Sequence, residues 1–124
     1  MLKKVLVVDD SALIHQMYKM VLIRYDCAIV SAKNGKEALD VIGKNPDTDL
    51  MLVDINMPVM NGLEFIKKVK ELGTYNHIPI VIVSTDGKEE DTRRGISLGA
   101  SGYVTKPVQP SALHALIERV CPPA

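Results

Sequence analysis

The chain has 124 residues, and its 15 Lys plus Arg balance its 15 Asp plus Glu, giving a formal net charge of zero. This length suits one domain with one core, and the balanced charge argues against nucleic acid or an anionic membrane as a partner. No apolar run approaches the ~18 residues of a membrane-spanning helix, and an acidic pair interrupts the N-terminal apolar run too early for a signal peptide. The two cysteines, Cys27 and Cys121, form no CxxC pair, which favours reduced thiols and a cytoplasmic protein.

Five short apolar runs, rich in β-branched residues, predict five strands. Near-continuous runs of this kind are typical of parallel strands that are buried on both faces. In chain order they are KVLVV (4–8), AIVSA (28–32), DLMLVD (49–54), IPIVIVS (78–84) and GYVT (102–105).

Segments with helical spacing follow each predicted strand. Ser11 is placed to cap the first helix, the second covers 35–42, and the fourth starts near Lys88 and stops at Gly99. The fifth helix starts at Pro110, a residue that is tolerated at a first helical position. The expected apolar positions are Leu13, Ile14, Met17, Met20 and Val21 in the first helix, Leu63, Ile66, Val69 and Leu72 in the third, and Ala112, Leu113, Leu116, Ile117 and Val120 in the fifth. This alternation predicts a single α/β domain over residues 1–124, an open parallel sheet with helices on both faces.

Polar side chains occupy the carboxyl ends of four predicted strands. Ligands of open α/β sheets bind outside these ends, where the strand order reverses. Each residue alone also has an ordinary structural reading, as a helix cap or a solvated charge, but together they predict a site. They are Asp9, Asp10, Asp54, Ser84, Thr85, Thr105 and Lys106.

Three of these residues are acids, and they converge if the first and third strands are neighbours. Two unit charges 4 Å apart repel by ~4 kcal/mol at an effective dielectric constant of 20, so a divalent cation is the natural compensation. Oxygen donors without His or Cys favour Mg²⁺. Beside such a cation the Asp54 carboxylate can act as a nucleophile towards a phosphoryl group, with Lys106 and Ser84 neutralising the phosphoryl oxygens.

The chain resembles the receiver domains of two-component response regulators, most of all the stand-alone chemotaxis (CheY-like) type, from Lys3 to Val120. The motifs that carry the resemblance are VLVVDDS, MLVDINMPVMNG, PIVIVST and GASGYVTKP. It implies a sheet in the order 2-1-3-4-5 with five helices on both faces. It also implies a signalling switch in which Asp54 accepts a phosphoryl group from a histidine kinase or phosphotransfer protein.

The resemblance assigns roles around the acceptor carboxylate. Asp10 is implied to ligate Mg²⁺ directly, Asp9 mainly through water, and Asn56 through its backbone carbonyl. Lys106 is implied to contact the phosphoryl group and to form a cis peptide bond with Pro107. The implied metal ligands are therefore Asp9, Asp10, Asp54 and the Asn56 carbonyl.

Further residues are implied to respond to phosphorylation. Ser84 is the switch hydroxyl and Tyr103 the aromatic that fills the space behind it, which changes the partner affinity of the face formed by the fourth helix, fifth strand and fifth helix. An ordinary buried strand tyrosine is the alternative for Tyr103. Asn56, Asp86 and Thr85 are expected to modulate the phosphoryl group, and Thr85, where the family commonly has Ala or Gly, to crowd it.

The expected partners are the kinase, a downstream protein target and a phosphatase, with the chain itself a monomer acting in chemotaxis or motility. No enzymatic activity is expected beyond its own phosphotransfer and autodephosphorylation, and no output domain follows the fifth helix. A receiver module cut from a larger regulator and a pseudo-receiver that is not phosphorylated remain alternatives. A flavodoxin-like cofactor binder is disfavoured because the acids of DDSAL repel phosphate, and an aspartyl phosphatase because Asn56 stands where a second acid is usual.

Overall fold

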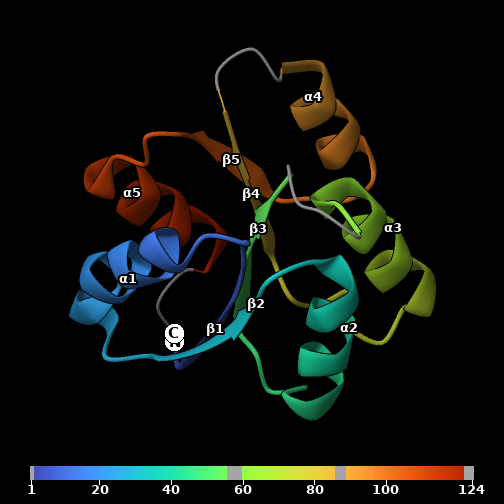
Figure 1. The fold of residues 1–124 in the computed structure, drawn as a ribbon, viewed down its shortest axis with the longest axis horizontal. Coiled ribbons are helices and arrows are strands. Elements are labelled where there is room, and N and C mark those ends of the chain that lie inside the picture. The colour runs from blue at the N-terminus through green and yellow to red at the C-terminus, as the bar shows by residue number, and fades with distance from the viewer. Residues whose placement is uncertain (1, 56–59, 86–88, 122–124) are drawn as a thin grey trace.

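The computed structural model describes residues 2–55, 60–85 and 89–121. They form one parallel sheet in the order β2-β1-β3-β4-β5 (Figure 1). The strands are β1 (Lys4–Val8), β2 (Ala28–Ala32), β3 (Leu50–Asp54), β4 (Ile80–Ser84) and β5 (Gly102–Thr105). The helices are α1 (Ala12–Val21), the short 3₁₀ helix η1 (Ile23–Tyr25), α2 (Gly35–Lys44), α3 (Gly62–Leu72), α4 (Glu89–Ser97) and α5 (Pro110–Val120). The predicted fold class and strand order are confirmed.

Two strands begin later than the apolar runs suggest. Asp49 precedes β3, and its carboxylate accepts the backbone N–H groups of Lys3 at 2.8 Å and Lys4 at 3.1 Å. Pro79 precedes β4 and has no N–H to contribute to a strand ladder. The predicted start of α4 near Lys88 lies outside the described residues. No helix in the described part of the chain combines the length and apolar character needed to cross a membrane.

Helices α1 and α5 cover one face of the sheet, and α2, α3 and α4 cover the other (Figure 1). Successive side chains of a strand point to opposite faces. Each central strand therefore contributes side chains to two hydrophobic cores, one on each face of the sheet. In β4, Ile80 and Ile82 pack into the core on the α2 and α3 side, whereas Val81 and Val83 pack into the core under α1 and α5. This double burial explains the near-continuous apolar runs.

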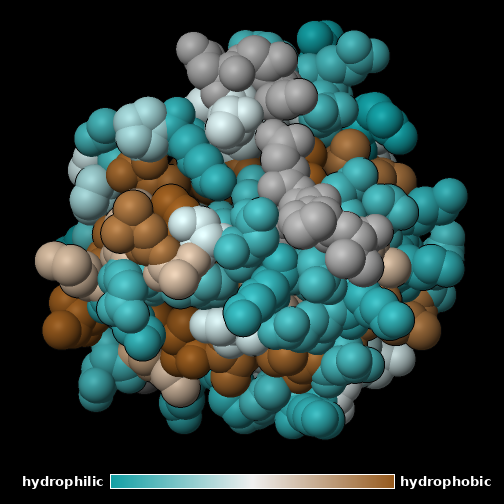
Figure 2. Space-filling model, in the orientation of Figure 1, coloured by the Kyte–Doolittle hydropathy of each residue, from teal (hydrophilic) through white to brown (hydrophobic). Residues whose placement is uncertain are grey.

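Helix α1 presents to the core a face that its apolar pattern predicts only in part: Ile14, Met17 and Val21 pack against the core as predicted. Tyr18 and Val21 are buried, but Leu13 is 78% exposed and Met20 is 77% exposed, so their predicted burial is wrong. Leu72 and Ala112, also predicted to be apolar contacts, are exposed as well. Apolar side chains are accordingly visible on the side of the molecule where α1 and α5 lie (Figure 2).

Side-chain caps fix the starts of the first three helices. The Ser11 hydroxyl accepts the Ile14 N–H at 3.3 Å, as predicted, and Asn34 caps α2 in the same way. Asn61 and Glu64 form a reciprocal capping box at the start of α3. Each helix therefore leaves its preceding strand at a defined position.

A polar bridge connects the two helices of the α1 and α5 layer. His114 in α5 lies with Nε2 at 2.7 Å from the Val21 carbonyl oxygen and Nδ1 at 2.8 Å from Arg24 Nη1. Nε2–H donates to the carbonyl, and Nδ1 consequently accepts from the guanidinium. His114 thereby connects α5 to the last residue of α1 and to η1.

Helix α4 contributes little apolar surface to its core. Its buried residues are Thr92 and Gly95, whereas α3 buries Leu63, Phe65, Ile66 and Val69. A side chain at Gly95 would meet the end of Ile82, so a small residue is needed for α4 to approach β4. Close backbone approach replaces side-chain packing at this helix.

A substitution at Gly62, at the start of α3, tests how tightly the backbone is packed beside the carboxyl end of β3. A Cβ atom there would contact the Asp54 carbonyl oxygen and lie 2.9 Å from Ile55 Cα, and backbone atoms cannot rotate away. We expect Gly62→Ala to lower the free energy of unfolding by about 1–3 kcal/mol. In α2, Gly43 has nothing within 4 Å of its Cβ position, and Gly43→Ala should raise stability by about 0.5–1 kcal/mol. Urea unfolding measures both, and equal midpoints for the two variants would contradict the packing described.

Candidate functional site

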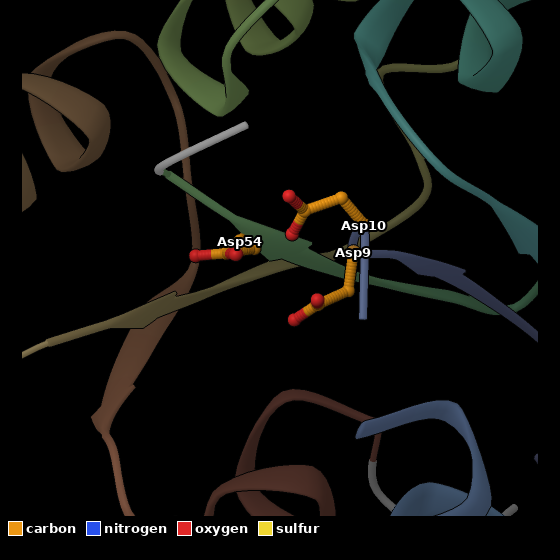
Figure 3. A group of neighbouring side chains, drawn as sticks. All are labelled: Asp9, Asp10 and Asp54. Carbon is orange, nitrogen blue, oxygen red and sulfur yellow. The ribbon is translucent and has the colours of Figure 1, made fainter. Parts of the chain in front are cut away.

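Three carboxylates meet at the carboxyl ends of β1 and β3 (Figure 3). Val8 pairs with Val53, so Asp9 and Asp54 follow at neighbouring strand ends. One oxygen from each of Asp9, Asp10 and Asp54 lies within 4.8 Å of the others. Asp9 is 1% exposed and Asp54 3% exposed, whereas Asp10 is open to solvent. Because Asp9 and Asp54 are shielded from water, the repulsion between their carboxylates is strong.

Lys106 supplies a cation to this cluster from the end of β5. Its Nζ lies 3.2 Å from Asp54 Oδ2 and 3.4 Å from Asp9 Oδ2. Burial lowers the pKa of Lys106, but the charges of Asp54 and Asp9 and their hydrogen bonds outweigh it, and the net pKa is raised. The side chain therefore stays charged and bridges the two buried carboxylates. Its peptide bond to Pro107 is cis.

The Asp9 side chain and backbone are held by their neighbours. Its Oδ1 accepts the Ser11 N–H at 2.8 Å, and its own N–H donates to the Ala32 carbonyl at 3.0 Å. His15 Nε2 lies 2.7 Å from the Asp9 carbonyl oxygen and donates to it. These bonds fix one wall of the cluster before any ligand arrives.

The donor set suits a hard divalent cation. The cluster consists of three carboxylates with one ammonium beside it, so negative charge remains in excess. Magnesium is bound in proteins by a few carboxylates together with water and substrate phosphates. The predicted fourth ligand, the Asn56 carbonyl, lies outside the described residues, as does Asp86.

Ser84 and Tyr103 lie on the α4 side of this strand edge. Ser84 is buried, and its Oγ accepts a hydrogen bond from Thr92 Oγ1 at 3.2 Å. Tyr103 is 55% exposed, which does not fit an ordinary buried strand tyrosine. Both line a cavity of about 680 Å³, together with Thr85 and Thr92.

Sequence reasoning missed Tyr18 and Thr92 as neighbours of the site. Burial raises the pKa of Tyr18, and the negative charges of Asp9 and Asp54 raise it further. Ile14, Tyr18 and Val21 recur at spacings of four and three, so Tyr18 could have been placed on the buried face of α1. Thr92 has no comparable signal, because its importance comes from its contact with Ser84 in another element.

The Tyr18 environment predicts a pH dependence. Its native pKa lies above the ordinary value of 10.0, so the unfolded chain releases this proton first. The resulting stability is fully present below pH 10 and is lost as the pH rises towards the native pKa. We expect the ultraviolet absorbance difference between wild type and Tyr18→Phe to show tyrosinate formation near pH 10 in urea but not in the folded protein. Ionisation of Tyr18 near pH 10 without unfolding would contradict this environment.

Comparison with known proteins agrees with this geometry. The family model described as the response regulator receiver domain matches residues 5–118. A chemotaxis protein CheY homolog from Campylobacter jejuni is 37% identical over 118 residues, covering 94% of this chain and 91% of that protein. CheY1 from Helicobacter pylori is 35% identical over 118 residues, covering 94% of this chain and 95% of that protein.

Solved structures show the same likeness in three dimensions. The chemotaxis protein CheY4 of Vibrio cholerae superposes with a TM-score of 0.86 at 37% identity, covering 97% of this chain and 99% of that one. The family match spans both strand ends that carry the acids and the end of β5 that carries Lys106. The chain belongs to the receiver domain family of two-component response regulators.

Proposed function

We propose that this chain is a phosphorylation-dependent signalling switch in which Asp54 accepts a phosphoryl group from a histidine kinase or phosphotransfer protein. The observation that carries the proposal is the position of Asp54. This carboxylate is 3% exposed, lies 3.2 Å from the Lys106 ammonium and shares its edge of the sheet with Asp9 and Asp10. Because the relatives from Campylobacter jejuni and Helicobacter pylori are named chemotaxis proteins, control of chemotaxis is the response we propose first.

The transfer itself needs one bond to form and one to break. An Asp54 carboxylate oxygen attacks the phosphorus of a phosphohistidine, the O–P bond forms, and the P–N bond breaks with its electron pair going to the imidazole nitrogen. Lys106 is positioned to neutralise charge on the phosphoryl oxygens. Asp9, Asp10, Asp54 and the Asn56 carbonyl would hold Mg²⁺, which adds positive charge next to the same oxygens. The chain thus catalyses only its own modification.

Phosphorylation then changes the surface beside the site. It adds a charge of about −1.5 to −2 and three acceptor oxygens at Asp54. In our proposal the Ser84 hydroxyl turns towards these oxygens, and the exposed Tyr103 ring moves into the cavity it lines with Ser84. The face of α4, β5 and α5, which carries a second groove of about 830 Å³ between β5 and α5, then changes its affinity for a downstream protein or a phosphatase.

Labelling with a small acyl phosphate tests the acceptor. Incubation with acetyl phosphate and Mg²⁺ should add the mass of one phosphoryl group to the intact chain, because Asp54 is the carboxylate placed for attack. Asp54→Asn should remain unlabelled. Asp40→Asn, which removes an exposed carboxylate of α2, is the control and should label like the wild type.

Two outcomes would contradict the proposal. If the folded wild-type chain never gains mass, it is not phosphorylated and acts instead as an interaction module. If Asp54→Asn is still labelled, the phosphoryl acceptor is a residue other than Asp54. The labelled samples also give the phosphoryl lifetime after the donor is removed. We propose that Thr85, Asn56 and Asp86 modulate this lifetime, and Thr85→Ala should shorten it.

Magnesium binding is a separate prediction. A cation that binds the native site stabilises it by about 2.7 kcal/mol at a hundred times its Kd, and thermal unfolding with and without Mg²⁺ measures this gain. Asp10→Asn should abolish the gain, since it removes the solvent-exposed ligand, whereas Asp40→Asn should retain it. If calorimetry shows no Mg²⁺ uptake at millimolar concentration, the metal assignment is wrong.

A further inference from the structure

Ser84 and Asp54 end neighbouring strands but belong to opposite faces of the sheet. Along β4, Ile80 and Ile82 pack on the side of α2 and α3, and strand alternation places Ser84 with them. Along β3, Leu50 and Leu52 pack under α1 and α5, and alternation places Asp54 with these. The Ser84 hydroxyl must therefore come round the end of the sheet to reach a group on Asp54.

A hydrogen bond holds this hydroxyl on its own side. Thr92, in the middle of α4, donates from Oγ1 to Ser84 Oγ at 3.2 Å. The two side chains are 6% and 3% exposed, so water offers little replacement for the bond. Turning Ser84 away from α4 gives up this hydrogen bond in a place that water scarcely reaches, and the bond therefore opposes that movement.

The space around the bond allows such a movement. Ser84 and Thr92 line the same cavity of about 680 Å³ as Tyr103. The Tyr103 ring is 55% exposed and leaves that cavity open. The hydrogen bond with Thr92 is therefore a specific restraint on the Ser84 hydroxyl beside this cavity.

We propose that Thr92 is a positioning residue that keeps the Ser84 hydroxyl turned towards α4 in the unmodified protein. Recruiting Ser84 to a phosphoryl group on Asp54 then requires the Thr92 bond to break, and α4 loses this hydrogen bond to the end of β4 in the same event. This inference rests on the proposed role of Ser84. It gives the acceptor site a direct connection to α4 through one pair of hydroxyls.

The test removes the hydroxyl of Thr92 while keeping its shape. Thr92→Val should accelerate labelling by acetyl phosphate about two- to twelve-fold, the factor that corresponds to the ~0.5–1.5 kcal/mol of a typical net hydrogen bond. Thr92→Ser keeps the hydroxyl and should label at the wild-type rate. In a Ser84→Ala background, Thr92→Val should leave the labelling rate unchanged. This double-mutant cycle separates the effect of the Thr92–Ser84 interaction on the rate from that of any other interaction of Thr92.

A second measurement does not depend on phosphorylation. Scalar couplings of the Ser84 β-protons report its χ1 rotamer by NMR, and we expect one rotamer in the wild type and in Thr92→Ser but rotamer averaging in Thr92→Val. If the wild-type chain is never labelled, the proposed function is wrong. Rotamer averaging of Ser84 in Thr92→Val would still support the restraint by Thr92 in that case. The inference is overturned by a single unchanged rotamer in folded Thr92→Val, by equal acceleration in Thr92→Val and Thr92→Ser, or by acceleration that persists without the Ser84 hydroxyl.

Discussion

The repulsion among Asp9, Asp10 and Asp54 is the constraint on which the site depends. Parallel pairing of β1 with β3 forces these acids together, and two of them are buried. At an effective dielectric constant of 20, each pair of charges 4 Å apart costs ~4 kcal/mol. Lys106 reaches Asp9 and Asp54 from the end of β5. The order of the strands therefore creates the repulsion among the acids and also brings a positive charge that offsets part of it.

The site uses both faces of one sheet. Lys106 and the buried acids lie on the side of α1 and α5, where Tyr18 packs beneath them. Ser84, Thr92 and Tyr103 surround a cavity on the α4 side. In the proposed switch, the acceptor chemistry and the response thus lie on opposite faces of the sheet, and Ser84, the last residue of β4, is the link between them.

Much of this arrangement could be predicted from sequence because its causes are local. The β-branched runs predict the strands, Ser11 predicts its cap, and polar residues at strand ends predict the cluster. The apolar pattern predicts burial in α1 only in part, because this helix has apolar residues on adjacent faces. Packing against the sheet decides that Tyr18 is buried and Met20 exposed. The Thr92–Ser84 contact joins two elements at positions that no periodicity marks. The Lys106 bridge depends likewise on strand order, which family resemblance provided.

The sparse apolar content of α4 has a mechanical consequence. In the α1 and α5 layer, His114 forms hydrogen bonds with Val21 and Arg24, and large aliphatic and aromatic side chains pack against the sheet. The buried residues of α4 are a threonine and a glycine, so the helix contributes little apolar surface of its own to the core. Elements of this kind occupy the low end of the range of local opening free energies. A helix that buries so little apolar surface of its own needs less energy to shift than the well-packed layer on the opposite face, and a single covalent modification supplies energies of that smaller size.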